Sequence, residues 1–176
     1  MRAATFFLVG RSSAKFPELV RRIAALGHTI AHHSFSHPII SKISFEQAKE
    51  DIELGIAADE MALNGVWIRP RSAPFFRFPY FDSTPATLDF VHSRGIVAFG
   101  AGLWASDWEN ITHGEALKNL PDQLESSRRG IILLHDAQAR TAAMMPVLLR
   151  YLRESGYRIV HLVSAGPMQS KDQIAP

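Results

Sequence analysis

Short apolar runs alternate along this chain with segments in which apolar residues recur every three or four positions. The short runs predict strands, and the recurring positions predict amphipathic helices. A glycine separates a predicted helix from the next predicted strand at four places: Gly27, Gly95, Gly130 and Gly156. This alternation predicts a parallel sheet covered by helices, either an α/β barrel or an open α/β sheet.

The apolar runs predict six strands, at residues 5–9, 28–31, 75–78, 96–99, 131–134 and 157–163. Ser44 with Gln47, and Thr112 with Glu115, have the spacing of capping boxes and predict two helix starts. The second of these helices is expected to break at Pro121. The run at 131–134 is typical of a strand that is buried on both faces.

Length and composition indicate one globular domain, which we expect to span residues 3–163, with residues 164–176 as a tail. The chain has 176 residues, of which 47% are hydrophobic and 20% charged, and its net charge is +2. No basic run exceeds two residues, so a nucleic-acid partner is not expected. The chain has no cysteine and no stretch of about 20 apolar residues, which argues against thiolate metal sites and membrane-spanning helices. The sequence does not indicate the cellular compartment.

Polar clusters follow four of the predicted strands. They lie at residues 32–38 (HHSFSHP), 77–80 (RFPY), 107–108 (DW) and 135–136 (HD). Catalytic sites of parallel α/β proteins form at the carboxyl ends of the strands, so these clusters are the candidate site.

His33 and His37 lie four residues apart, a spacing that can bring two imidazoles to one side of a turn, where a divalent cation could bridge them. Pro38 disfavours a long helix here and favours a tight turn. The alternative is a pair of loop histidines without a ligand. Two histidines also make an incomplete site, because catalytic divalent ions usually have three protein ligands.

The other clusters have alternatives of their own. Arg77 could be a surface arginine beside a proline turn, and Asp107 could cap a helix beside a partly buried Trp108. His135 follows an apolar strand, so it is either a core histidine with a satisfied partner or a proton donor.

The order of these motifs changes the picture. The strand at residues 4–10, HSFSHP at 33–38, RFPY at 77–80, Asp107-Trp108 and LLHD at 133–136 together resemble the polysaccharide deacetylase family, the NodB-homology carbohydrate esterases. The resemblance covers residues 3–163. It implies a distorted (β/α) barrel that uses one divalent ion, expected to be zinc or else cobalt or another divalent metal, to hydrolyse the acetamide of an N-acetylated poly- or oligosaccharide.

The resemblance also implies roles for the polar residues. His33 and His37 would bind the metal, and Arg77 would orient the catalytic base. Asp107 would orient and tune His135, which would be the general acid. These roles agree with the needs of amide hydrolysis, which include an activated water, a base and an acid that protonates the leaving amine.

Three further residues would contact the substrate according to the resemblance. Tyr80 would shape the pocket, and Trp108 and Leu133 would line the part that receives the acetyl group.

One motif of the family is missing. A TFDDG-like strand end would supply the base and a third metal ligand, but the 176 residues contain no Asp-Asp pair. Either the sequence is a fragment without the first barrel strand, which we expect, or the protein is a carbohydrate-binding pseudoenzyme. A small metal-binding α/β domain without a sugar ligand is a third possibility. A barrel without one strand has open edges, so we expect residues 1–176 alone to self-associate and to lack deacetylase activity.

Overall fold

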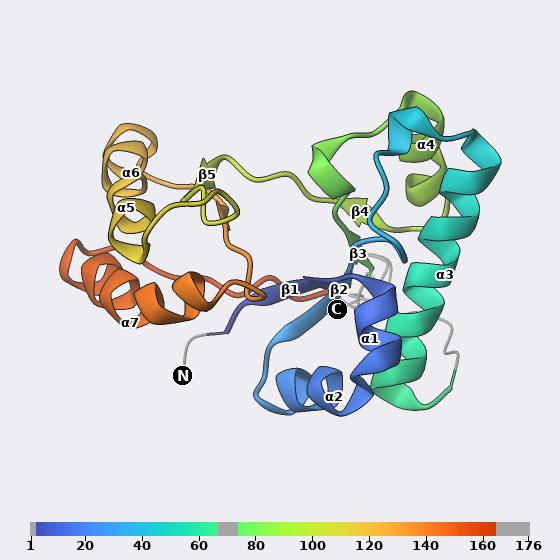
Figure 1. Ribbon diagram of the computed structural model, residues 1–176, viewed down its shortest axis with the longest axis horizontal. Coiled ribbons are helices and arrows are strands. Elements are labelled where there is room, and N and C mark those ends of the chain that lie inside the picture. Colours follow the sequence, from blue (N-terminus) through green and yellow to red (C-terminus); the bar gives the residue numbers. More distant parts are fainter. Residues whose placement is uncertain (1–2, 67–73, 165–176) are drawn as a thin grey trace, which may run out of the picture. The chain divides into compact units, whose positions relative to one another are not determined.

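The computed structural model describes residues 3–66 and 74–164 (Figure 1). The chain divides into two compact units. Unit 1 comprises residues 1–99 and 160–176, and unit 2 comprises residues 100–159. The expected tail, apart from Ser164, lies outside the described residues.

Unit 1 contains a sheet of four parallel strands in the order β1-β2-β3-β4. The strands are β1 (Thr5–Leu8), β2 (Thr29–His32), β3 (Phe75–Phe76) and β4 (Val97–Ala98). In the register of the sheet, His32 lies between Leu8 and Phe76. The carboxyl ends of β1, β2 and β3 are therefore level, and the residues that follow them share one edge.

The helices of unit 1 are α1 (Gly10–Lys15), α2 (Pro17–Ala25), α3 (Phe45–Asn64) and α4 (Pro85–Ser93), with short 3-10 helices η1 (Ile40–Lys42) and η2 (Pro79–Phe81). Helix α3 is the longest of these and runs beside α1 in Figure 1. Its buried stripe packs with residues of β3 and α4 in one core, formed by Ala48, Ile52, Ile56, Phe76 and Val91 among others.

The predicted capping boxes are confirmed. The hydroxyl of Ser44 accepts from the Gln47 N–H at 3.2 Å, and the side chain of Gln47 accepts from the Ser44 N–H at 2.9 Å. Helix α3 ends at Gly65, whose φ of 73° is left-handed and suits a residue without a Cβ. Thr112 and Glu115 open α5 in the same way.

Unit 2 contains two parallel strands, β5 (Leu103–Trp104) and β6 (Ile132–Leu133). Its helices are α5 (His113–Lys118), α6 (Pro121–Ser127) and α7 (Ala139–Glu154). Helix α6 begins at Pro121, where the sequence predicts a break. The unit has a core of its own, built on Leu103, Leu120, Met144 and Leu148.

The α/β class with parallel strands is confirmed, and among the described residues the strands form these two sheets without a closed barrel. Four details of the sequence prediction differ from the structure. Ile131 is 37% exposed, so the segment 131–134 is not buried on both faces. Helix α1 and strand β5 were not expected, and Asp107 follows β5 instead of the strand at 96–99.

The predicted strand at 157–163 is also wrong, since this segment makes no ladder. In unit 2, Tyr157 and Ile159 pack against the core instead. In unit 1, the hydroxyl of Thr29 donates to the carbonyl of Leu162 at 2.8 Å. No helix within the described ranges has the length and apolar content required to cross a membrane.

Candidate functional site

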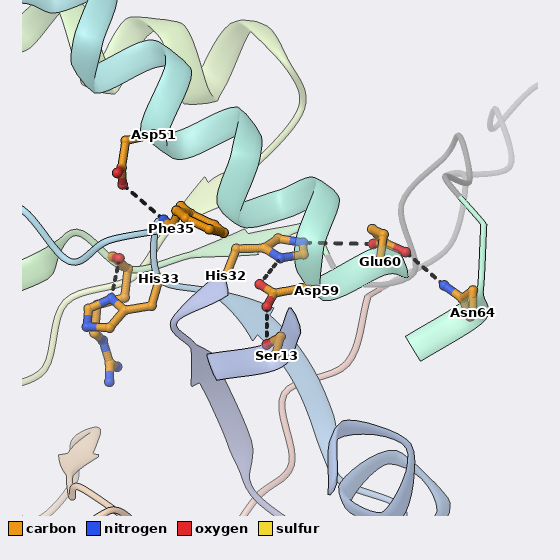
Figure 2. A network of polar contacts seen from close by, with 9 residues as sticks. Ser13, His32, His33, Phe35, Asp51, Asp59, Glu60 and Asn64 are labelled. Carbon is orange, nitrogen blue, oxygen red and sulfur yellow. Dashed lines mark hydrogen bonds and ion pairs between the residues drawn. The ribbon is translucent and has the colours of Figure 1, made fainter. Parts of the chain in front are cut away.

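His32 and His33, at the end of β2, direct their side chains to opposite faces of the sheet. The backbone N–H of His33 donates to the Leu8 carbonyl at 2.9 Å, and the His32 carbonyl accepts from the Arg77 N–H at 2.9 Å. Neighbouring strands thus hold this backbone on both sides. Consecutive side chains of a strand point to opposite faces. Figure 2 shows the His32 ring directed toward α3 and the His33 ring directed away from it.

His33 and His37 lie together, as their spacing predicts. Their ring centroids are 4.8 Å apart, with an angle of 74° between the planes. His37 also contacts Tyr80, with the two centroids at 4.7 Å. Tyr80 is 64% exposed, so the three rings form an accessible aromatic cluster at this edge of unit 1.

The hydrogen bonding of His33 suits a metal ligand. Its Nδ1 donates to the backbone carbonyl of Arg77 at 2.6 Å, which fixes the tautomer whose Nε2 carries the lone pair (Figure 2). Metal-binding histidines usually make such a bond with the other ring nitrogen. The chemistry of this pair fits zinc or cobalt, for which neutral imidazole is a common ligand. No group of three or more His, Asp or Glu residues in the described part of the chain could hold a metal.

Arg77 is buried at the same edge. Its guanidinium lies 4.1 Å from the centroid of the Phe7 ring, and its Nε donates to the Phe99 carbonyl at 3.3 Å. Burial lowers the pKa of Arg77 to about 10, so the group stays charged at neutral pH. A buried cation at this position can orient a carboxylate.

A polar network lies on the other side of β2 (Figure 2). His32 Nδ1 is 2.8 Å from one oxygen of Asp59, and the hydroxyl of Ser13 donates to the other at 2.5 Å. Glu60 Oε1 lies 3.9 Å from His32 Nε2. All four side chains are buried. Burial raises the pKa of Asp59 above its ordinary value, and the hydrogen bonds from His32 and Ser13 only partly oppose this effect.

Unit 2 brings together the second pair of predicted residues. Asp107 Oδ1 lies 2.9 Å from His135 Nδ1, and Oδ2 accepts from the backbone N–H of His135 at 2.6 Å. The hydroxyl of Thr141 on α7 also donates to Asp107 Oδ2. Burial favours the protonated carboxyl, but the hydrogen bonds from His135 and Thr141 outweigh it, so the pKa of Asp107 is lowered.

Of the three residues expected around the substrate, Trp108 and Leu133 are in unit 2 with this pair, whereas Tyr80 is in unit 1 beside His37. Trp108 is 44% exposed and meets the His135 ring edge-on, with centroids 5.5 Å apart. Leu133 is buried and lies opposite Trp104 in the register of β5 and β6. Only Leu134 separates His135 from Leu133 along the chain, so an imidazole and an apolar surface follow from the same strand end.

Two residues of the site were missed from the sequence. Thr141 begins the buried stripe that continues to Met144 and Leu148, and a hydroxyl on such a stripe could have indicated a buried polar partner. Asp51 directly precedes Ile52 on the buried stripe of α3, and its carboxylate holds the loop between His33 and His37. Neither residue has a recognisable motif of its own.

The sequence model of the polysaccharide deacetylase family matches residues 2–99, more than half of the chain. The chain belongs to the polysaccharide deacetylase family. The matched residues include both histidines, Arg77 and Tyr80, so the resemblance found in the sequence is confirmed for unit 1.

Similarity to known proteins extends into unit 2 as well. A chitooligosaccharide deacetylase from Azorhizobium caulinodans is 31% identical over 76% of this chain and 60% of its own length. A solved peptidoglycan deacetylase from Bdellovibrio bacteriovorus is 32% identical, with a TM-score of 0.82 over 94% of this chain and 45% of its own. A pseudoenzyme of the CE4 family from Bacillus anthracis, at 19% identity and a TM-score of 0.75, shares the fold. The chain thus spans about half the length of such relatives.

Proposed function

We propose that this chain takes part in the metal-dependent removal of acetyl groups from the amide nitrogen of an N-acetylated saccharide. The observation that carries the proposal is the pair formed by Asp107 and His135. The Asp107 carboxyl is completely buried, whereas the His135 side chain is 40% exposed. A buried carboxylate that holds Nδ1 of an accessible imidazole orients the ring and stabilises its protonated form, which suits a histidine that acts as a general acid.

The proton transfer follows from this geometry. With Asp107 ionised, the Nδ1–H of His135 donates to the carboxylate, and the protonated imidazole carries its second proton on Nε2. That proton can pass to the nitrogen of the leaving amine as the carbon–nitrogen bond breaks. Amide nitrogen leaves poorly without a proton, and general acid catalysis of such a step typically contributes about 10²–10⁴-fold to the rate.

His33 and His37 would hold the divalent ion, which when bound would polarise the acetamide carbonyl and activate water. The Arg77 carbonyl orients His33 through its Nδ1, and the Arg77 guanidinium would orient the carboxylate base. Trp108 and Tyr80 are both exposed and offer the flat surfaces on which sugar rings pack. Peptidoglycan and chitooligosaccharides are the substrates that the names of the relatives suggest.

A carbohydrate-binding pseudoenzyme is the second candidate. It is favoured by one observation, the lack of an Asp-Asp pair in the 176 residues, because that pair would include the base. Under this proposal the aromatic residues bind sugar, and no acetate is released.

Acetate release by the natural protein tests both candidates. With zinc or cobalt added, the protein should release acetate from N-acetylglucosamine oligomers or from peptidoglycan fragments. His135→Ala should lower kcat by about 100-fold or more and leave zinc affinity unchanged. His33→Ala should lower the affinity for zinc in calorimetry. Saturable binding of the oligomers without any acetate release would contradict the deacetylase proposal and support the pseudoenzyme proposal.

A further inference from the structure

The loop that joins His33 to His37 rests on a carboxylate from α3. Asp51 Oδ1 accepts from the backbone N–H of Phe35 at 2.9 Å and from that of Ser36 at 3.2 Å. Its Oδ2 accepts from the hydroxyl of Ser36 at 2.6 Å. Figure 2 shows the Asp51 side chain extending from α3 to the backbone at Phe35. One carboxylate therefore binds two of the three residues between the histidines.

The loop has a backbone that needs such support. Ser34 and His37 both have a φ of 62°, in the left-handed region that is unfavourable for residues with a Cβ. Within the loop, the Ser34 hydroxyl accepts from the His37 N–H at 3.1 Å. Conformations of this kind persist where surrounding contacts fix them.

Backbone contacts complete the support. The carbonyls of Ser34 and Phe35 accept from the N–H groups of Gly10 and Arg11, at 2.8 and 3.1 Å. The α3 backbone also approaches closely, since a Cβ at Gly55 would lie only 2.3 Å from the carbonyl carbon of Ser34. Gly55 lies one turn after Asp51 on α3. The same face of the helix therefore allows the loop backbone to approach closely and supplies the carboxylate that binds it.

We infer that Asp51 is a positioning residue, which holds the rings of His33 and His37 at the separation that a divalent cation requires. The inference rests on the proposed function for its metal. The two rings are fixed at opposite ends of the loop, one by the sheet and the Arg77 carbonyl, the other by the turn. Asp51 binds this turn at Phe35 and Ser36, and it thereby determines the position of the His37 ring relative to the His33 ring.

Asp51→Asn is the direct test. An amide has one oxygen where the carboxylate has two, so the atom in the place of Oδ2 becomes an N–H donor that faces the Ser36 N–H, which in the wild type donates to Oδ2 at 3.2 Å. The backbone bond from the Phe35 N–H to the Asp51 carbonyl, at 3.0 Å, survives and helps the variant to fold. The affinity for zinc in calorimetry should fall by about 10–100-fold, the loss typical of groups that orient metal ligands.

Glu115→Gln is the matched control. The Glu115 carboxylate also accepts from one backbone N–H and one hydroxyl, both of Thr112, but it caps α5 in unit 2. It should leave zinc affinity unchanged. Ser36→Ala removes one hydroxyl contact and keeps the Asp51 carboxylate, so it should lower the affinity by a smaller factor. This second variant keeps the test valid if Asp51→Asn does not fold.

A metal-free readout separates this inference from the proposed function. In the metal-free protein, nuclear Overhauser contacts between the rings of His33 and His37 should be present and should be lost in Asp51→Asn. If the ring contacts are lost in Asp51→Asn but the wild type does not bind zinc, the positioning role is supported and the metal site is contradicted. Unchanged ring contacts and unchanged zinc affinity in both Asp51→Asn and Ser36→Ala would overturn the inference.

Discussion

Asp107 accepts hydrogen bonds from both the imidazole Nδ1 and the backbone N–H of His135. One carboxylate thereby fixes the ring of His135 and the chain that carries it directly after β6. The same carboxylate accepts from Thr141, so α7 is tied to this point too. The orientation of the candidate acid and the stability of unit 2 consequently depend on the same group.

Replacing Asp107 should destabilise the protein. Asp107→Asn removes the charge and turns one acceptor into a donor that faces other donors. We expect a loss of about 2 kcal/mol in the free energy of unfolding at pH 7, measured with urea, because hydrogen bonds to charged groups contribute about 1.5–3 kcal/mol each. Asp89→Asn, at an exposed position of α4, is the control and should change little. Equal loss in both variants would contradict the role of Asp107.

The lowered pKa of Asp107 sets a pH dependence. A carboxyl whose folded pKa lies below its unfolded pKa stabilises the protein above about pH 4, and this contribution is lost as the pH falls through the folded pKa. The stability difference between wild type and Asp107→Asn should therefore shrink as the pH is lowered below about 4. Unfolding curves at several acidic pH values measure it. A difference that stays constant would show that the pKa is not lowered.

Asp59 should behave in the opposite way. Burial raises its pKa, so its contribution is fully present below the unfolded pKa of about 4 and is lost as the pH rises through the folded pKa. Asn does not titrate and can still accept from Ser13. The stability of Asp59→Asn relative to wild type should thus increase from about pH 4 upward. The exposed Glu18→Gln on α2 is the control for the loss of one carboxylate.

Thr141 should contribute through its hydroxyl alone. Thr141→Val keeps the shape of the side chain but removes a donor to Asp107, and should cost about 1–2 kcal/mol in the free energy of unfolding. Thr141→Ser keeps the hydroxyl and should recover most of that loss. If Ser and Val cost the same, packing of the methyl group and not the hydrogen bond explains the effect.

Arg77 gives a fourth site to test. Its planar guanidinium stacks on Phe7, a contact that an ammonium group does not reproduce. Arg77→Lys should lower the free energy of unfolding by about 1 kcal/mol, whereas Arg22→Lys at an exposed position of α2 should leave it unchanged. Thermal or urea unfolding decides between these outcomes.

Local signals in the sequence predicted those parts that local interactions determine. Ser44 and Thr112 mark helix starts because a capping box is complete within four residues. Helix α1 escaped prediction because its contacts are distant: Ser13 bonds to Asp59, 46 residues away. Strand β5 is only two residues long, and Gly102 and Ser106 interrupt the apolar run around it.

The residues of the candidate site likewise fall into those that local sequence signals predict and those that they do not. His33, Arg77 and His135 were predictable because each follows a strand end. Asp51 and Thr141 were not, because their roles depend on which helix face meets which loop. That relation is set by packing between distant segments, and neither residue type indicates it alone.

The convergence of Gly10, Ser34 and Gly55 also determines how this protein can vary. A Cβ at Gly10 would lie 2.7 Å from the Cα of Gly55, and one at Gly55 would enter the backbone of Ser34. In a mutant library selected only for folded protein, glycine should therefore be retained at positions 10 and 55, while position 51 should accept other residues. Selection for metal binding should restrict position 51 as well. Selection for folding would thus restrict position 55 of α3, and selection for metal binding would also restrict position 51, one turn earlier on the same helix.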